Sequence, residues 1–241
     1  MTVTGHGTDT VRTLRGLEDD RASVRLRAAL AIGSTPDPRF VDTLVERCAV
    51  EPEFFVRDML TWALTRHPVS VTLPLLLREV RSERTRARSQ ALHTLSKIGD
   101  RRAWPAITRA LLTDADDEVA RSAWRAAVVL VPEEEEAALA ALLATQLGRG
   151  GRETRLSLSQ ALVALGDAMT PAVDAATRVP EPLVRAHALA TQRLLRDPDA
   201  GFTLAVEEAK RVVALGGHDG SGGSHGSGGV SGSSGSLEEG P

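Results

Sequence analysis

Apolar side chains recur along the chain in a pattern that predicts short helices. Counting from Ala87, the residues at offsets 0, 4, 8 and 11 are Ala87, Ala91, Leu95 and Ile98. At about 100° per residue these offsets fall within one narrow arc of a helix, so they predict one buried stripe. Gly99 follows the stripe, at the point where a residue in the left-handed conformation commonly ends a helix.

A second helix is expected directly after the first. Pro105 lies near the start of the segment 102–112. Proline is tolerated in a first helical turn because its missing N–H would be unpaired there in any case. We therefore expect a continuous helix over residues 102–112, so that the stripe helix and this one form a unit.

The stripe recurs at six places, which predicts a repeat. Its first residues are spaced 32, 31, 32, 35 and 30 residues apart. A period of this size is typical of a solenoid built from stacked helix pairs. The six stripes begin at Val24, Val56, Ala87, Val119, Thr154 and Val184.

The repeat resembles the HEAT-repeat family in its short bacterial form, which is also seen in phycobilin lyases. The resemblance is carried by Val24-Arg25, by Val56-Arg57 and by the run ARSQALHTLSKIGDRRAWPAI at 87–107. It covers the chain from about Asp9 to Leu215 and is similar to repeat arrays of actinobacterial proteins. It implies an all-α fold, a right-handed α-solenoid of about six HEAT-like helix pairs with a C-terminal capping helix. Such modules mostly serve interactions, so the resemblance implies a fold rather than an activity.

The composition changes at both ends of the repeat region. Residues 1–8 are polar and hold two glycines, which predicts a disordered N-terminus before a first helix that begins at Asp9 or Thr10. Residues 201–215 are amphipathic and are expected to form the capping helix. Residues 216–241 are rich in glycine and serine, which predicts a flexible tail or linker. The solenoid is therefore expected over residues 9–215.

Composition narrows the function without naming it. The net charge is −3, which gives no general electrostatic argument for nucleic acid. Cys48 is the only cysteine, and no apolar run is long enough to cross a membrane, so we expect a cytoplasmic protein. Motifs for a nucleophile elbow, a phosphate loop or a zinc protease are absent. We expect no catalytic residue, no metal and no cofactor.

The best candidate for a binding site lies opposite the buried stripe. Trp62, His93 and Arg125 share offset six on successive repeats, and Trp and Arg are residue types that anchor protein interfaces. In solenoids of this kind the second helices line the concave wall, so the three side chains are expected to form one row. The alternative is that Trp62 is partly buried and the others are ordinary surface, while Trp124 is expected in the core. Neighbouring candidates are Met59, Gln90 and Gln160.

A series of arginines at offset one has two interpretations. It forms either a basic stripe for nucleic acid or a ladder packed between neighbouring repeats, paired with turn acids such as Asp20 or Asp117. We favour the ladder because the position lies at the edge of the buried arc; the fourth repeat has Ala120 there. The arginines are Arg25, Arg57, Arg88, Arg155 and Arg185.

A second basic cluster falls in the third repeat. It is either an anion-binding edge, for nucleic acid or an acidic partner, or an ordinary solvated face. No aromatic side chain is interleaved for base stacking, which favours the solvated face. The candidates are Arg81, Arg84, Arg86, Arg101 and Arg102.

Three classes of function follow from these patterns. The first is a non-catalytic scaffold, regulatory or not, that binds a protein or peptide on its concave face through the row of Trp62, His93 and Arg125. The second is nucleic-acid binding through the arginine-rich edge. The third, implied by the resemblance to phycobilin lyases alone, is a lyase or chaperone that acts on a bilin-bearing protein.

Overall fold

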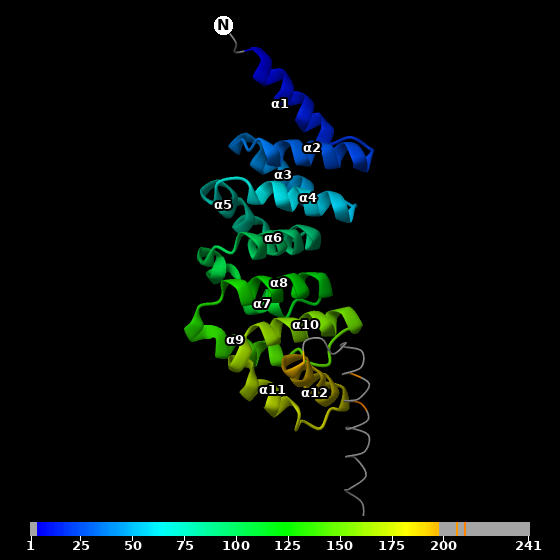
Figure 1. Ribbon diagram of the computed structural model, residues 1–241, viewed down its shortest axis with the longest axis vertical. Helices are drawn as coiled ribbons and strands as arrows, with labels where there is room; N and C mark the ends of the chain where they lie inside the picture. Colours follow the sequence, from blue (N-terminus) through cyan, green and yellow to red (C-terminus); the bar gives the residue numbers. More distant parts are fainter. Residues whose placement is uncertain (1–3, 198–205, 207–209, 211–241) are drawn as a thin grey trace, which may run out of the picture.

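The computed structural model describes residues 4–197 together with Val206 and Lys210. Within these residues the protein is all-α, and its helices follow one another as pairs (Figure 1). In chain order the helices are α1 (Thr4–Leu17), α2 (Ala22–Ser34), α3 (Val41–Val50), α4 (Phe54–Thr65), α5 (Val69–Glu79), α6 (Thr85–Ile98), α7 (Arg109–Leu112), α8 (Asp117–Leu130), α9 (Glu136–Ala144), α10 (Arg152–Ala164), α11 (Thr170–Ala176) and α12 (Pro182–Arg196). Short 3-10 segments precede four of them: η1 (Pro38–Phe40), η2 (Arg101–Ala106), η3 (Glu133–Glu135) and η4 (Gly166–Met169).

The helices form two layers of a solenoid. Each odd-numbered helix packs on the even-numbered helix that follows it, which makes six pairs among the described residues. Helices α2, α4, α6, α8, α10 and α12 pack on one another in that order, and we call them the inner layer (Figure 1). The other layer runs from α3 to α11. This arrangement confirms the predicted all-α solenoid of six helix pairs.

The predicted stripes form the core between the layers. In α6 the stripe residues Ala87, Ala91 and Leu95 are buried, whereas Ile98 at the helix end is half-buried. Small alanines let the inner helices approach closely, and each fully buried leucine contributes roughly 1.5–3 kcal/mol relative to exposure. Trp124 is fully buried, as expected, and its Nε1–H donates to the carbonyl of Leu112 at 2.8 Å.

Helix ends follow local sequence signals. Gly99 has φ of +69° and ends α6, in the left-handed conformation that the sequence predicts. At the start of α8, the Asp116 carboxylate accepts the backbone N–H of Glu118 at 2.9 Å and that of Val119 at 3.1 Å. These contacts pair two N–H groups that the helix itself leaves free.

Two predicted boundaries differ from the structure. Helix α1 begins at Thr4, five residues before the expected start at Asp9, because no proline interrupts the segment and the backbone hydrogen bonds continue. The continuous helix expected over 102–112 is broken into η2 and α7. Pro105 lies inside η2, where it supplies no N–H, and Thr108 begins α7 by accepting the N–H of Leu111 at 3.4 Å.

The predicted capping helix lies largely outside the described residues, as does the tail at 216–241. Val206 and Lys210 are described, and Val206 is helical. It packs against Ala186 and Ala190 of α12. In the part of the chain that the structure describes, no helix is both long and apolar enough to cross a membrane.

Candidate functional site

The inner layer has a surface that faces away from the outer layer, which we call the free face. At about 100° per residue, offsets −1, 2 and 6 point away from the buried stripe. The offset-six residues Trp62 and Gln160 are exposed, and His93 and Arg125 are half-buried. The same position in α12 is Ala190, which is fully buried against a cluster that includes Val206. The free face therefore carries the predicted row on α4, α6 and α8.

Trp62 packs against the preceding inner helix with one part of its ring and leaves the other part exposed. The residue is 37% exposed, and its ring lies against Gly33 of α2. A Cβ at Gly33 would overlap the ring, so only glycine fits there. The ring is thus held toward the preceding repeat, and its outer part forms an apolar surface on the free face.

His93 lies next to charged neighbours on both sides. Burial lowers its pKa to about 4, and the positive charges of Arg125 and Lys97 add to this effect. Asp58 of α4 acts in the opposite direction and raises the pKa. His93 is therefore neutral at pH 7 and can offer a partner a hydrogen bond rather than a charge.

Arg125 is a half-buried cation with no carboxylate partner among the described residues. Its Nη2 donates to Ser122 Oγ at 3.0 Å, and its buried Nε has no hydrogen-bond acceptor there. Burial lowers its pKa, as does the charge of Arg121, whose own guanidinium pairs with Glu153 at 3.2 Å. This guanidinium can accept an anionic group from outside the chain.

The remaining candidates of the row are less closely grouped. Met59 is half-buried and packs against the core, and Gln90 is half-buried on α6. Gln160 is exposed but lies on α10, one helix beyond Arg125. The structure therefore brings Trp62, His93 and Arg125 onto one surface with Gln90, while Met59 supports the packing beneath.

The offset-one arginines form the predicted ladder. The Arg25 Nη1 donates to the carbonyls of Asp19 and Asp20, both at 2.8 Å. Arg57, Arg88 and Arg185 donate in the same way to the two carbonyls six and five residues before them. Each guanidinium therefore ties the start of its helix to the preceding turn. Arg155 makes no such contact within the described ranges.

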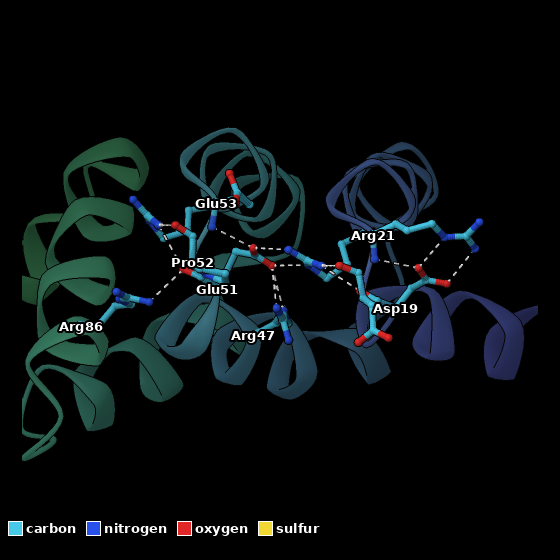
Figure 2. Close-up of polar contacts among 10 residues, drawn as sticks. Asp19, Arg21, Arg47, Glu51, Pro52, Glu53 and Arg86 are labelled. Carbon is cyan, nitrogen blue, oxygen red and sulfur yellow. Dashed lines mark hydrogen bonds and ion pairs between the residues drawn. The ribbon is translucent and has the colours of Figure 1, made fainter.

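The acids that pair with this ladder differ from those expected. Asp20 offers its carbonyl rather than its carboxylate, and the acid that pairs with Arg25 is Glu51 of the next repeat (Figure 2). Arg88 pairs likewise with Asp114 of the next repeat at 3.2 Å. The turn residue five positions before a stripe thus pairs with the arginine of the preceding repeat. The sequence pattern within one repeat does not predict this contact, because the two residues belong to different repeats.

Glu51 is the centre of the most buried ionic cluster (Figure 2). Its carboxylate accepts from Arg25 Nε at 2.7 Å and Nη2 at 2.8 Å, from Arg47 Nη2 at 2.8 Å and from the Glu53 N–H at 3.0 Å. Its carbonyl accepts from Arg86 Nη1 at 3.2 Å. Burial alone would raise the pKa of Glu51, but the hydrogen bonds from Arg25, Glu53 and Arg47 outweigh it and lower the pKa to about 2. The cluster joins the first repeats and is structural.

The fourth repeat lacks the ladder arginine, and a different residue replaces it. Ala120 occupies offset one, and the two turn carbonyls before it, of Asp114 and Ala115, accept instead from Arg149 Nη2. Arg149 comes from the following repeat and also pairs with Asp117 at 2.8 Å. Asp117 thus pairs with a residue outside the predicted ladder.

Two of the five arginines of the predicted anion-binding edge, Arg84 and Arg102, are neutralised by carboxylates. Arg84 forms two hydrogen bonds to Glu46, at 2.7 and 3.0 Å, and Arg102 pairs with Asp100 at 2.6 Å. Arg86 donates to the Glu51 carbonyl. Only Arg81 and Arg101 among the five candidates are exposed without a polar partner in the described chain. The arrangement resembles a solvated ionic face more than a continuous anion site.

Buried titratable groups have structural roles. The thiol of Cys48 lies in the core, and burial raises its pKa to about 12. His187 Nδ1 accepts the N–H of Gly148 at 2.9 Å, so its proton is on Nε2, which lies 3.0 Å from the carbonyl of Arg155. Burial lowers the pKa of His187 to about 4. Across the described ranges, no group of three or more His, Cys, Asp or Glu side chains could hold a metal ion.

Sequence reasoning missed one exposed aromatic pair. Phe54 and Phe55, at the start of α4, are 63% and 77% exposed, and their rings contact edge to face with centroids 5.7 Å apart. The signal was present in the sequence. Both residues precede the buried stripe at Val56, and Phe55 is at offset −1, which points to the free face.

Comparison with known proteins adds a likeness of fold. No protein-family model and no curated protein matches the chain. Human deoxyhypusine hydroxylase in complex with glycerol is 17% identical, with a TM-score of 0.44 over 86% of this chain and 95% of that one. An engineered protein is 20% identical, with a TM-score of 0.40 over 85% and 62%. The complex of CpcE and CpcF of phycocyanin lyase from a Nostoc species is 15% identical, with a TM-score of 0.38 over 83% and 93%.

Likenesses this distant carry no statement about activity, and they leave the bilin-related alternative as a resemblance alone. The architecture is established by the chain's own packing. Its consecutive helix pairs, stacked in two layers, make the described part of the chain an all-α solenoid.

Proposed function

We propose that this protein is a non-catalytic scaffold that binds a protein or peptide partner on the free face of its inner layer. The observation that carries the proposal is the guanidinium of Arg125. It is half-buried, it forms no ion pair within the described residues, and its one hydrogen bond there runs from Nη2 to Ser122 Oγ. A half-buried guanidinium without a carboxylate can form charge-assisted hydrogen bonds to an acid from a partner, which supports a ligand at this place.

The chemistry of the row favours an acidic partner group. A carboxylate that approached Arg125 would form charge-assisted hydrogen bonds in a partly desolvated place, where such bonds are strong. Arg121 pairs with Glu153, and the Glu118 carboxylate acts on Arg125 against the effect of burial. Neutral His93 adds no charge, so Arg125 is the cation that a partner acid would meet. An aspartate, a glutamate or a C-terminal carboxylate of a partner protein fits this position.

Trp62 supplies an apolar surface two inner helices away from Arg125. Packed helices lie about 8–10 Å apart, so the two side chains are separated by roughly 20 Å along the stack. A partner segment that binds both would carry an apolar residue and an acid at about that separation. Exposed tryptophan and arginine are the residue types that contribute most to protein interfaces.

The proposal is tested by affinity capture from a lysate of the source organism, with and without nuclease. The bait is the full chain, the Arg125→Glu variant, or a control with Arg109→Glu, which makes the same charge change on an exposed position of α7. We expect a stoichiometric protein partner that resists nuclease, is reduced at least about 10-fold by Arg125→Glu and is retained by the control.

Two results would contradict the proposal. The first is a partner whose recovery is the same with Arg125→Glu as with the unchanged chain. The second is recovery that depends on nucleic acid, which would favour the alternative of nucleic-acid binding and direct attention to Arg81 and Arg101. Thermal unfolding of each variant establishes that a lost partner reflects the surface and not the fold.

A further inference from the structure

The exposed pair of Phe54 and Phe55 lies beside a hollow on the free face. The Arg57 guanidinium is 6.0 Å from the centre of the Phe54 ring, and Arg57 also lines the hollow. The hollow is open and lies between the first turns of α4, α6 and α8. Its lining consists of Arg57, Thr85, Arg86, Ser89, Gln90, Asp116 and Glu118.

Two arginines on one side of the hollow have no carboxylate partner in the described chain. Arg57 Nη1 donates to the carbonyls of Glu51 at 3.0 Å and Pro52 at 2.6 Å. Arg86 Nη1 donates to the Glu51 carbonyl alone. Backbone carbonyls hold both guanidinium groups in place without neutralising them. This side of the hollow therefore keeps its positive charge.

The opposite side of the hollow has the opposite charge. Asp116 uses its carboxylate to accept backbone N–H groups at the start of α8, and Glu118 is exposed. Neither forms an ion pair within the described residues. Along the stack the surface is thus apolar at α4, positive between α4 and α6, and negative at α8.

We infer that this surface, which we call the turn-edge groove (Phe54, Phe55, Arg57, Arg86, Asp116 and Glu118), binds an extended segment of a partner protein. The segment carries an apolar residue, an acidic residue and a basic residue in that order along the stack, opposite α4, the α4–α6 side and α8. The inference rests on the proposed function, because it takes the chain to be a partner-binding scaffold, and adds the class of segment that is recognised.

The geometry sets the spacing of these residues. Neighbouring helices lie about 8–10 Å apart, and an extended chain advances about 3.3 Å per residue. With the acid opposite Arg86 of α6, one helix from Phe55 on α4 and one from Glu118 on α8, successive anchor residues of the segment are about three positions apart. Phe54 and Phe55 provide the apolar contact, since an aromatic pair left in water releases much surface when it is covered.

The turn-edge groove is separate from the row of Trp62, His93 and Arg125. Phe55 and Trp62 are seven residues apart on α4, which places them about 10 Å apart along the helix axis. One extended segment that runs along the stack fills one of the two surfaces. Variants of Phe55 and of Trp62 therefore report on different surfaces.

The test uses a displayed library of random 16-residue peptides, selected on the full chain. Selected peptides are synthesised with a fluorescent label, and their affinity is measured by fluorescence polarisation. The variants are Phe55→Ser, Arg86→Glu, Glu118→Lys and Trp62→Ala, with Arg86→Gln to remove the charge while keeping a donor to the Glu51 carbonyl. Phe55, Arg86 and Glu118 are exposed, so we expect their variants to unfold at nearly the temperature of the unchanged chain.

We expect the selected peptides to share an apolar residue, an acid and a base at spacings of about three, in one chain direction or the other. Phe55→Ser, Arg86→Glu and Glu118→Lys should each weaken binding at least about 10-fold, whereas Trp62→Ala should leave it within about twofold. A peptide with its acid and base exchanged should bind the Arg86→Glu/Glu118→Lys double variant better than the unchanged chain.

The inference and the proposed function fail in different ways. Peptides that lose affinity with Trp62→Ala or Arg125→Glu but not with Phe55→Ser would overturn the turn-edge groove and support the row. Selection of no common pattern, or affinity unchanged by both charge reversals, would also overturn the groove. If lysate capture contradicts the role of Arg125 but the selected peptides still bind the turn-edge groove, the binding surface of the scaffold is the groove and not the row.

Discussion

Neighbouring repeats are linked by an arginine that donates to the turn before an inner helix, and we call each such link a joint. At the joint between the first and second repeats the arginine comes from the earlier repeat, whereas at the joint between the fourth and fifth repeats it comes from the later one. In the first, Arg25 extends from its own helix to the carbonyls of Asp19 and Asp20 and continues to Glu51 of the next repeat. In the later joint, Ala120 occupies that position, and Arg149 of the next repeat extends back to the equivalent carbonyls.

The comparison teaches which part of the joint is shared. Glu51 and Arg149 occupy the same place in the repeat, five residues before a stripe, yet they have opposite charges. What both joints retain is a guanidinium on the two turn carbonyls before the inner helix. At these two joints the cation is thus the shared element, and either neighbouring repeat can supply it.

The largest effect should come from breaking the first joint at Glu51. Glu51→Gln leaves the Arg25 and Arg47 guanidinium groups without their buried carboxylate, and loss of one partner of a buried ion pair costs about 3–5 kcal/mol. Chemical denaturation followed by circular dichroism measures the change in the free energy of unfolding. Glu53→Gln, two residues away and exposed, is the matched control and should change stability by less than about 0.5 kcal/mol.

Acid should weaken the first joint through the same carboxylate. The folded-state pKa of Glu51 is about 2, below its ordinary value of 4.5. A depressed pKa stabilises the folded state fully above pH 4.5, and the stabilisation is lost as the pH falls from 4.5 toward 2. It amounts to about 3 kcal/mol at pH 7. The difference in unfolding free energy between the unchanged chain and Glu51→Gln should shrink over this range, and a constant difference would contradict the role given to Glu51.

Breaking the later joint should have a smaller effect. Arg149→Ala leaves the carbonyls of Asp114 and Ala115 and the carboxylate of Asp117 without this donor, at a cost of about 1–3 kcal/mol. The guanidinium is partly exposed, so water replaces some of the lost contacts.

A charge exchange sharpens the test of the later joint. Arg149→Asp with Ala120→Arg would recreate the order of arginine and acid found at Arg88 and Asp114. The double variant should recover at least half of the stability lost by Arg149→Asp alone. A double-mutant cycle in chemical denaturation measures this coupling, and simple additivity would show that the joints are not interchangeable.

The smallest effect should come from completing an incomplete joint. Ser82 stands where the second joint would have an acid, and it accepts the Arg84 N–H at 3.3 Å. Ser82→Asp keeps this hydrogen bond and places a carboxylate beside Arg57, as Asp114 does beside Arg88. Because the site is half-exposed, the gain should be about 0.5 kcal/mol, seen as a small rise in the temperature of unfolding. Ser82→Asn, without the charge, should show no gain.

The row of candidate residues was found from the repeat because offset fixes the face of a helix. Trp62, His93 and Arg125 lie on the free face for this reason. The degree of burial was not predictable, since the contact of Trp62 with Gly33 depends on how closely two helices pack. The exposure of Phe54 and Phe55 likewise depends on the neighbouring turns.

The sequence by itself determined the helix pairs and their stacking. The apolar stripe and its period are local properties, and burying such a stripe requires a neighbouring helix. Only the tertiary structure decided the pairing of charges. Arg25 meets Glu51 rather than the carboxylate of Asp20, and Arg149 replaces the arginine missing at Ala120. Such contacts join residues about 25 to 35 positions apart, and their geometry exists once one repeat has docked against the next.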